Sequence, residues 1–163
     1  MVEPITFRPI GVIRTPYASV EGMPVQAALP AATGVAGWIE FEPDLIEGLA
    51  DLDGFSHVTL FYYFDRAGAP RLTVIPFLDV HPHGLFATRS PARPNPIGIS
   101  TVRLVAIEGA TIRIEDVDML DGTPLLDIKP YVPALDDRAD ARIGWYADRL
   151  ADARSDRRFS EPR

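Results

Sequence analysis

The segment GLFATRSPARPNPIGIS, residues 84–100, places two arginines and an asparagine among three prolines. Proline fixes φ and has no N–H to donate, so regular helix or strand pairing cannot begin before the last proline. We expect a stiff loop that holds Arg89, Arg93 and Asn95 in set directions. The planar guanidinium fork suits a carboxylate or a phosphate, because it binds two oxygens at once. In a structural corner the same arginines would cap carbonyl groups, and the residue types favour neither reading.

A second polar stretch, DVDMLDGTP at 116–124, carries Asp116, Asp118 and Asp121. Asp followed by Gly is typical of a β-turn whose carboxylate binds nearby backbone, and this structural reading is favoured for the stretch on its own. In the functional reading, the carboxylates accept hydrogen bonds from ribose hydroxyls or from an amine. Asp118 and Asp121 are then the candidates for a catalytic general base, provided that one of them reaches the proton to be removed.

Asp79, His81 and His83 lie close together in LDVHPHG and supply atom types that bind metals. Two histidines separated by one residue in a loop are weak evidence, since further ligands would have to come from elsewhere. We therefore expect ordinary loop histidines and no metal. The chain has no cysteine, which excludes disulfides and thiolate zinc sites.

The composition is that of a single globular domain with a sizeable core, since 47% of the 163 residues are apolar. The formal net charge of −7 argues against binding nucleic acid through the overall field of the protein. A local basic patch remains compatible with that charge. The N-terminus has no leader pattern and no apolar run has the length of a membrane span, so we expect a cytoplasmic protein with no membrane association.

Runs of β-branched and aromatic residues, bounded by glycine and proline, are typical of short strands. We expect strands within 5–17, 35–41, 57–64 and 71–77, and a hairpin over 97–119 that turns at Glu108-Gly109. The run 57–64 is almost entirely apolar, which predicts burial on both faces. Residues 121–133 are rich in turn formers and predict only one short extended piece.

Two helices are expected as well. Leucines recur at helical spacing in 43–55, and an amphipathic pattern covers 136–153. Many short strands with few helices predict a mainly β fold, namely a small antiparallel β-barrel with a short helix and a C-terminal helix. We expect residues 1–135 to form the barrel domain, and residues 136–163 to be a C-terminal helix and tail of the same domain.

Three segments, IGVIRTPY, GLFATRSPARPNPIGIS and DMLDGTPLLDIKPYVP, together resemble the TrmO family, also called TsaA-like or YaeB-like. They occur in the family's order and span roughly Ile10 to Pro133, and the two longer blocks are rare in composition. The resemblance implies an S-adenosylmethionine-dependent methyltransferase that is built on a small β-barrel and works as a homodimer. It also implies tRNA as the substrate, with N6 of threonylcarbamoyl-adenosine beside the anticodon as the acceptor.

The resemblance further implies a set of residues that contact the cofactor. They are Pro24, Val25, Gln26, Asp65, Arg66, Arg89, Ile99, Met119, Leu120, Asp121 and Gly122. The family usually has arginine where this chain has valine in PVQ, and often has His-Gln where this chain has Asp-Arg. Substrate contacts are expected at Arg93, Asn95 and Lys129. The larger bacterial members carry a C-terminal domain that this sequence does not contain.

In this scheme Arg89 is the candidate partner of the methionyl carboxylate or, as the alternative, of a tRNA phosphate. Asp121 or the backbone around Leu120 accepts from the ribose hydroxyls. The region of Ile99 and Met119 forms the wall beside the sulfonium. Two alternatives stay open. One is a module that binds S-adenosylmethionine without turnover, as a sensor or partner subunit. The other is methyl transfer to a different acceptor, such as a small molecule.

Overall fold

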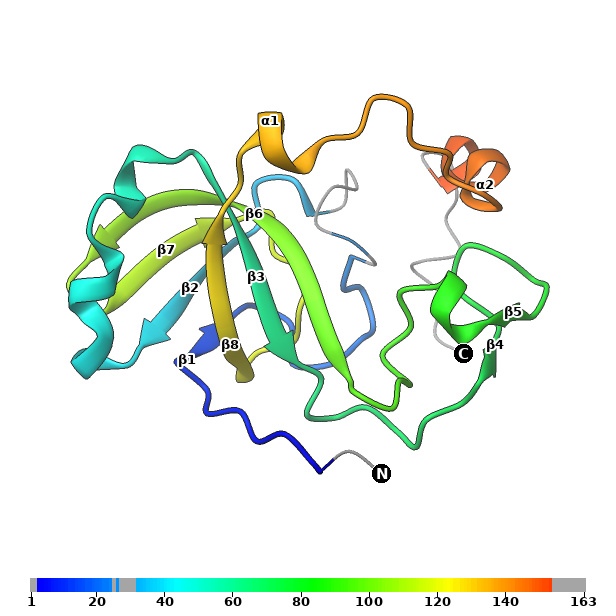
Figure 1. Cartoon of the computed structure of the whole chain (residues 1–163), viewed down its shortest axis with the longest axis horizontal. Helices are drawn as coiled ribbons and strands as arrows, with labels where there is room; N and C mark the ends of the chain where they lie inside the picture. Colours follow the sequence, from blue (N-terminus) through cyan, green and yellow to red (C-terminus); the bar gives the residue numbers. More distant parts are fainter. Residues whose placement is uncertain (1–2, 25, 27–31, 154–163) are drawn as a thin grey trace.

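The computed structural model describes residues 3–24, 26 and 32–153. Six strands close into a barrel (Figure 1). Residues 64–96, which connect β3 to β6 and are called the excursion below, leave the barrel and carry a separate two-stranded sheet. The barrel strands follow the order β1-β2-β7-β6-β3-β8, and each neighbouring pair is antiparallel. The predicted fold class, a mainly β antiparallel barrel, is therefore confirmed.

The barrel strands are β1 (Gly11–Arg14), β2 (Ala36–Phe41), β3 (His57–Tyr63), β6 (Ile97–Glu108), β7 (Thr111–Glu115) and β8 (Thr123–Pro130). The separate sheet consists of β4 (Thr73–Val74) and β5 (His83–Gly84). The 3-10 turns are η2 (Pro43–Leu49), η3 (Leu52–Gly54) and η4 (Leu85–Ala87), and the α-helices are α1 (Pro133–Asp136) and α2 (Tyr146–Ala153).

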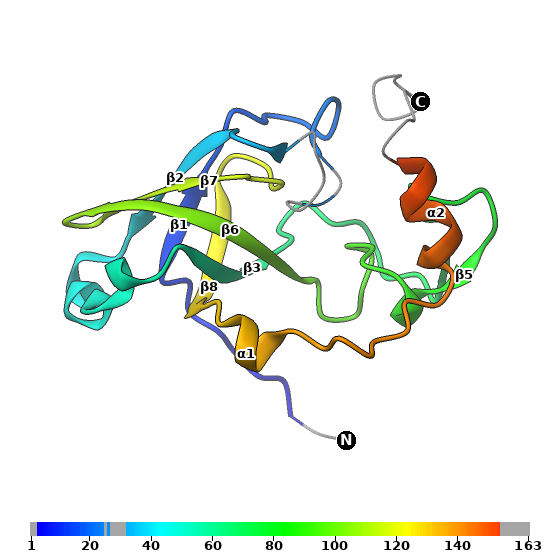
Figure 2. The ribbon, with the colours of Figure 1, turned by 90° about the horizontal axis from the view of Figure 1, so that it is seen from above.

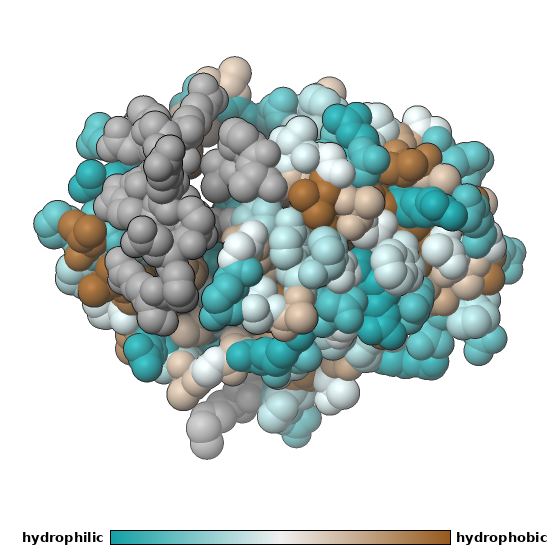
Figure 3. Space-filling model, turned by 180° about the vertical axis from the view of Figure 1, so that it is seen from behind, coloured by the Kyte–Doolittle hydropathy of each residue, from teal (hydrophilic) through white to brown (hydrophobic). Residues whose placement is uncertain are grey.

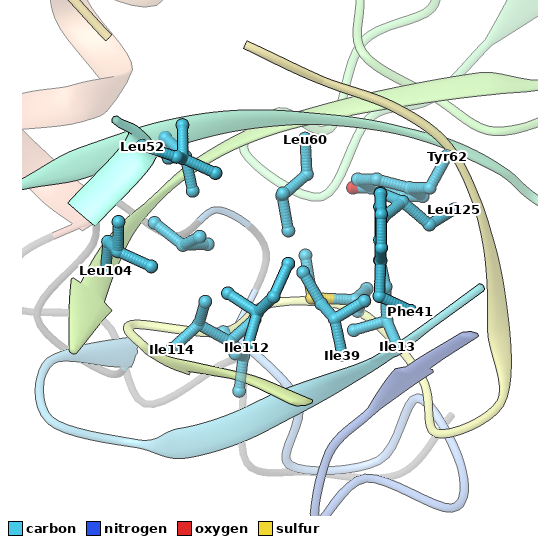
Figure 4. Packing of buried hydrophobic residues seen from close by; sticks show 14 of the residues in the cluster. Ile13, Ile39, Phe41, Leu52, Leu60, Tyr62, Leu104, Ile112, Ile114 and Leu125 are labelled. Atoms are coloured by element: carbon cyan, nitrogen blue, oxygen red, sulfur yellow. The ribbon is translucent and has the colours of Figure 1, made fainter. Parts of the chain in front are cut away.

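Apolar side chains fill the barrel because inward and outward positions alternate along each strand. In β7, Ile112 and Ile114 point inward and are 0% and 1% exposed. Figure 4 shows the packed cluster running from Leu52 and Leu104 at one end to Tyr62 at the other. The hydroxyl of Tyr62 is a polar atom at the edge of this core, and it lies at the end where the candidate site forms.

Strand β3 confirms the expected strand in 57–64, but the prediction that both its faces are buried is wrong. Val58, Leu60 and Tyr62 are buried, whereas the residues between them, such as Phe61, are only half-buried. In a closed barrel only one face of each strand meets the core, so an apolar residue on the outer face does not imply burial.

The hairpin of β6 and β7 is confirmed, and Gly109 adopts a positive φ of 60° in its turn. Strand β8 spans eight residues where only a short extended piece was expected. It lies between β1 and β3, and its ladders to both neighbours extend it through a proline-containing sequence. The predicted strand over 71–77 shrinks to two residues, because it pairs with the two-residue β5 and Pro76 lies two positions beyond its end.

The helix predictions hold in part. Residues 43–55 form two 3-10 turns instead of one α-helix, separated where Asp51 takes a left-handed φ of 64°. The C-terminal helix begins at Tyr146 and not near 136, because Gly144 has a positive φ of 56°. The part of the chain that the structure describes has no helix that is both long and apolar enough to cross a membrane.

Helix α2 lies against the excursion (Figures 1 and 2). The ring of Trp145 stacks on His83 with the centroids 4.4 Å apart, and its Nε1 donates to the carbonyl of Ala87 at 2.8 Å. Arg149 Nη2 lies 3.3 Å from Asp79 Oδ1. These contacts fasten the C-terminal helix to the segment that joins β3 to β6.

Candidate functional site

Several of the polar residues singled out in the sequence lie at the barrel end from which the excursion leaves. At this end β3 finishes, β6 begins, and the chain that leaves β7 passes beside both. Asp116 takes a left-handed φ of 66°, and its Oδ1 accepts from the N–H of Gly34 at 2.7 Å. Aspartate tolerates this conformation better than most residues do. The turn directs the following residue pair, Val117 and Asp118, into the barrel end, where both are buried.

Asp118 ends a buried chain of hydrogen bonds. Ser100 Oγ donates to Asp118 Oδ1 at 2.6 Å, and Tyr62 OH lies 3.0 Å from the same Oγ. Asp118 is 6% exposed, and Tyr62 and Ser100 are each 4% exposed. The carboxylate therefore sits in a nearly dry environment, supported from two strands.

Two phenols border this carboxylate. Burial raises the pKa of Tyr62 well above its ordinary value, and the charge of Asp118 raises it further. Burial, and then the same carboxylate, also raise the pKa of Tyr17. Both phenols therefore stay protonated at neutral pH. The charge of Arg89 opposes these effects at Tyr62, which puts Arg89 within electrostatic range of the chain.

Arg89 and Gln26, both predicted to contact a cofactor, are joined directly. Arg89 Nη1 donates to Gln26 Oε1 at 2.7 Å across 63 residues of sequence. Pro24, two positions before Gln26 in the sequence, is buried. Val25, also predicted to contact the cofactor, lies outside the described residues.

The segment 119–123 is fixed by Thr15, which directly follows β1, and by Arg66 at the start of the excursion. Thr15 Oγ1 donates to the carbonyl of Met119 at 2.8 Å, and the N–H of Thr15 donates to Asp121 Oδ1 at 3.2 Å. Arg66 Nη2 donates to the carbonyl of Asp121 at 2.8 Å and to Thr123 Oγ1 at 3.3 Å. Arg66 thus holds the backbone of this segment in place.

Asp118 and Asp121, the two predicted catalytic carboxylates, have different partners. Asp121 Oδ2 lies 3.7 Å from Arg14 Nη1 in addition to the bond that its Oδ1 accepts from Thr15. Its side chain is 43% exposed, whereas Asp118 is buried. The contacts of Asp121 are those of a residue that fastens the 119–123 segment to β1.

The proline-rich loop holds itself together through one of its own arginines. Arg93 Nη1 donates to the carbonyl of Thr88 at 2.8 Å, and its guanidinium lies 5.5 Å from the ring centroid of Phe86. Asn95 is exposed. Arg93 is thus a carbonyl cap, as in the structural reading, while Arg89 on the same loop points to Gln26. The loop is both a corner and the support of a candidate binding residue.

Three predicted residues lie away from this cluster or at its rim. Ile99 is on the outer face of β6 and is 44% exposed, since its inward neighbours are Gly98 and Ser100. Lys129 is on β8, where Nζ lies 2.8 Å from Asp127 Oδ2. Asp65 pairs with the neighbouring Arg66 at 3.2 Å.

Asp79 holds both loop histidines. Its Oδ1 lies 3.1 Å from His81 Nδ1, and its Oδ2 lies 3.1 Å from His83 Nε2. In the described ranges, no group of three or more His, Cys, Asp or Glu side chains is arranged to hold a metal ion. The carboxylate lies between the two rings and acts as a brace for the excursion.

A cavity of about 610 Å³ lies within the excursion and is lined by residues that include Arg71, Thr73, Ile75 and Ser90. None of the residues predicted to contact a cofactor or substrate lines it. This cavity and the polar cluster around Asp118 are therefore different places, and the convergent polar contacts favour the cluster as the functional site.

Sequence reasoning did not find Tyr62 and Ser100. Both look like ordinary strand residues, and only the register of β3 against β6 brings them to Asp118. One signal was present for Ser100. Alternation in GISTV makes the residues before and after Ile99 the inward pair, and a glycine and a serine are unusual in a barrel core.

Comparison with known proteins gives consistent matches. A probable S-adenosyl-L-methionine-binding protein of Pyrococcus abyssi is 52% identical over 158 residues, covering 95% of this chain and 85% of that protein. The tRNA (adenine(37)-N6)-methyltransferase of Escherichia coli K12 is 35% identical over 147 residues, covering 85% of this chain and 63% of that enzyme. The crystal structure of TrmO from Pseudomonas aeruginosa matches with a TM-score of 0.73 and 39% identity, covering 88% of this chain and 63% of that one.

The chain spans just under two thirds of the length of these two methyltransferases. Residues 12–137 match the family model described as the tRNA-methyltransferase O N-terminal domain. This range includes the excursion, the Arg89–Gln26 pair and the buried chain that ends at Asp118. On the strength of both sequence and fold, the chain belongs to the family of tRNA-methyltransferase O N-terminal domains.

Proposed function

We propose that the chain is an S-adenosylmethionine-dependent methyltransferase that acts on N6 of threonylcarbamoyl-adenosine in tRNA, next to the anticodon. The observation that carries the proposal is the meeting of Arg89, Gln26 and the buried Asp118 at one barrel end. Two relatives support it by name, one as a probable binder of S-adenosylmethionine and one as a methyltransferase of adenine 37 in tRNA. The threonylcarbamoyl group is the finer part of the proposal and rests on the resemblance of the motifs.

The side chains at this end fit a zwitterionic methyl donor. Arg89 offers a guanidinium to the methionyl carboxylate, and Gln26 orients it. Met119 is 2% exposed and contributes an apolar wall. When bound, the cofactor supplies a methyl group on a positively charged sulfur; the S–C bond breaks with its electron pair left on sulfur, an N–C bond forms, and a proton leaves N6.

Asp118 is the candidate that accepts this proton, because it is buried at the cluster and Ser100 fixes its orientation. The carboxylate of Asp121 is better suited to support, since it binds Thr15 and Arg14. Leu120, Asp121 and Gly122 would then contact the cofactor through their backbone, as Arg66 holds that segment still. Much of the catalysis would come from positioning, which can contribute on the order of 7–11 kcal/mol.

The tRNA surface in this proposal includes Arg93, Asn95 and Lys129. On the face shown in Figure 3, hydrophilic residues surround small apolar patches, as expected of a surface without one dominant apolar area. We also propose a cytoplasmic homodimer. Leu72, Phe77 and Phe86 on the excursion are 73%, 77% and 72% exposed, which supports an apolar contact with a second subunit.

The test uses the purified protein, S-adenosylmethionine with a labelled methyl group, and two tRNA preparations. One is total cellular tRNA, which contains threonylcarbamoyl-adenosine, and the other is the same tRNAs transcribed in vitro without modifications. After digestion to nucleosides, we expect label in N6-methylated threonylcarbamoyl-adenosine from the cellular tRNA alone. Asp118→Asn should lose the label while its thermal unfolding midpoint stays close to that of the wild type.

Label in both preparations would contradict the requirement for the threonylcarbamoyl group and leave adenine methylation in place. No label in either, with cofactor binding established by calorimetry on the same sample, would overturn tRNA methylation. A module that binds S-adenosylmethionine without turnover, or a different acceptor, would then account for the site.

A further inference from the structure

The hydrogen-bond chain at Asp118 has a direction that follows from counting protons. Ser100 Oγ lies 2.6 Å from Asp118 Oδ1 and 3.0 Å from Tyr62 OH. An ionised carboxylate only accepts, so the single hydroxyl proton of Ser100 goes to Asp118. Tyr62 must then donate to Ser100. The chain runs from Tyr62 through Ser100 to Asp118, and it ends in a negative charge.

This arrangement of donated hydrogen bonds stabilises the charged form of a buried carboxylate. Burial alone disfavours the charged form of Asp118, whereas a hydrogen bond donated to that form favours it. A short O–H···O⁻ contact belongs to the strong, charge-assisted class, and a second hydroxyl that donates to Ser100 strengthens it. Both hydroxyls therefore hold the Asp118 carboxylate in one orientation.

The charged and titratable groups around Asp118 come from several elements. Tyr62 lies on β3 and Tyr17 follows β1, and both remain neutral because burial raises the pKa of each phenol. Arg89, on the loop that precedes β6, lies within electrostatic range of Tyr62. The cluster thus brings a cation, Arg89, and a buried carboxylate, Asp118, within electrostatic range of the same neutral phenol, Tyr62.

We propose that Tyr62 and Ser100 are positioning residues that aim the Asp118 carboxylate at the sulfonium of the cofactor, so that the site prefers S-adenosylmethionine to S-adenosylhomocysteine. The inference rests on the proposed cofactor. The two molecules share their carboxylate, ammonium and adenosine groups, and they differ in one methyl group and the positive charge on sulfur. Arg89 binds the carboxylate, which both molecules have, and Asp118 interacts with the positive charge on sulfur, which only S-adenosylmethionine has. Loss of that charge on methyl transfer then promotes release of the product.

The test measures binding by calorimetry for both molecules and needs no tRNA. Asp118→Asn should weaken S-adenosylmethionine binding about tenfold, equivalent to about 1.4 kcal/mol, and leave S-adenosylhomocysteine binding within about twofold. Ser100→Ala and Tyr62→Phe should reduce the same preference by smaller factors, with Ser100→Ala the larger. Ser100→Thr, which keeps a hydroxyl, should restore it. Sinefungin carries an ammonium group in place of the sulfonium, so its binding should be weakened in the same variants and by similar factors as the binding of S-adenosylmethionine.

Thr101→Val provides the matched control. Thr101 Oγ1 and Thr59 Oγ1 lie 3.1 Å apart on the same two strands, outside the chain that leads to Asp118. Its removal should leave the preference unchanged.

Equal weakening of both ligands in Asp118→Asn would overturn the inference, since the carboxylate would then face the ammonium group or act on folding alone. A full effect in Asp118→Asn with none in Tyr62→Phe and Ser100→Ala would overturn the positioning role. If the wild type shows the preference but methylates no tRNA, the proposed acceptor fails and the inference stands. If the wild type binds neither molecule, both fail together.

Discussion

The ring of Tyr62 occupies the space that any side chain at Gly98 would need. A Cβ at position 98 would lie 2.1 Å from Cε2 and 2.4 Å from Cζ of that ring. The two residues are directly paired in the register of β3 and β6. The glycine in RPNPIGIS is therefore required by the phenol that starts the chain to Asp118.

We expect Gly98→Ala to displace Tyr62 and to lower the free energy of unfolding by about 1–3 kcal/mol, because the ring has no space into which it can move without strain. Chemical denaturation would measure the loss. Gly84→Ala is the matched control, since nothing lies within 4 Å of its Cβ and its φ is −59°. A Tyr62→Leu change should recover part of the loss in Gly98→Ala. A loss in Gly98→Ala no larger than in Gly84→Ala would show that the ring is not held there.

The sequence was sufficient to predict some elements of the fold and not others. Runs of β-branched and aromatic residues bounded by glycine and proline predicted most strands, because these residue types favour extended backbone. Strand β8 and the late start of α2 could not be predicted in the same way. The first depends on partners on both sides, and the second on the positive φ of Gly144.

The residues of the candidate site also fall into two groups, those that the sequence predicted and those that it did not. Arg89 and Asp118 stood out because charged residues in rigid or turn-rich segments are recognisable locally. Tyr62 and Ser100 did not, because their importance depends on the register between two strands separated by the whole excursion. The joining of Arg89 to Gln26 was also out of reach of local reasoning, since 63 residues separate the two positions.

Arg66 should act on the 119–123 segment and not mainly through its own charge. Its Nη2 binds the carbonyl of Asp121 and the hydroxyl of Thr123. We expect Arg66→Ala to cost about 1 kcal/mol of stability and to increase amide hydrogen exchange in 119–123, because the side chain is 43% exposed and its bonds compete with water. Arg113→Ala is the control. Arg113 forms only an exposed pair with Glu108 and should leave that exchange unchanged. Unaltered exchange in Arg66→Ala would contradict the anchoring role.

Asp79 should make the attachment of α2 sensitive to acid. Hydrogen bonds from His83, and then from His81, hold the pKa of Asp79 well below its ordinary value of 3.8. A carboxylate whose pKa falls on folding contributes stability that is complete above its unfolded pKa. That contribution is lost as the pH drops toward the folded value. We therefore expect the brace to hold at neutral pH and to weaken below about pH 4.

Trp145 reports on this brace because its ring stacks on His83. In a Trp38→Phe background, which leaves Trp145 as the only tryptophan in the sequence, fluorescence should change as the pH falls. Asp79→Asn should show the acid-like signal already at pH 7 with little effect on barrel unfolding. Asp148→Asn, on the exposed side of the same helix, should behave like the wild type. An unchanged signal in Asp79→Asn would rule out the brace.

Lys129 and Arg93, both predicted to bind substrate, should respond differently to substitution. Lys129 is 62% exposed on β8, where it pairs with Asp127 and its Nζ lies 5.9 Å from the ring centroid of Phe61. This exposure leaves its charge available to a phosphate. Arg93 is half-buried, and its bond to the carbonyl of Thr88 shapes the loop that carries Arg89. Replacing Arg93 should disturb cofactor and tRNA binding together, whereas replacing Lys129 should affect tRNA alone.

We expect Lys129→Glu to weaken tRNA binding, to reduce the slope of log affinity against log salt by about 1, and to leave S-adenosylmethionine binding unchanged. Arg93→Ala should weaken binding of both. Filter binding of tRNA over a salt series, with calorimetry of the cofactor, would separate the two. Arg113→Glu makes the same change of charge at another exposed ion pair, on β7. If Lys129→Glu weakened tRNA binding no more than Arg113→Glu does, the loss would reflect net charge, and the nucleic acid would have to approach the barrel from a side that excludes β8.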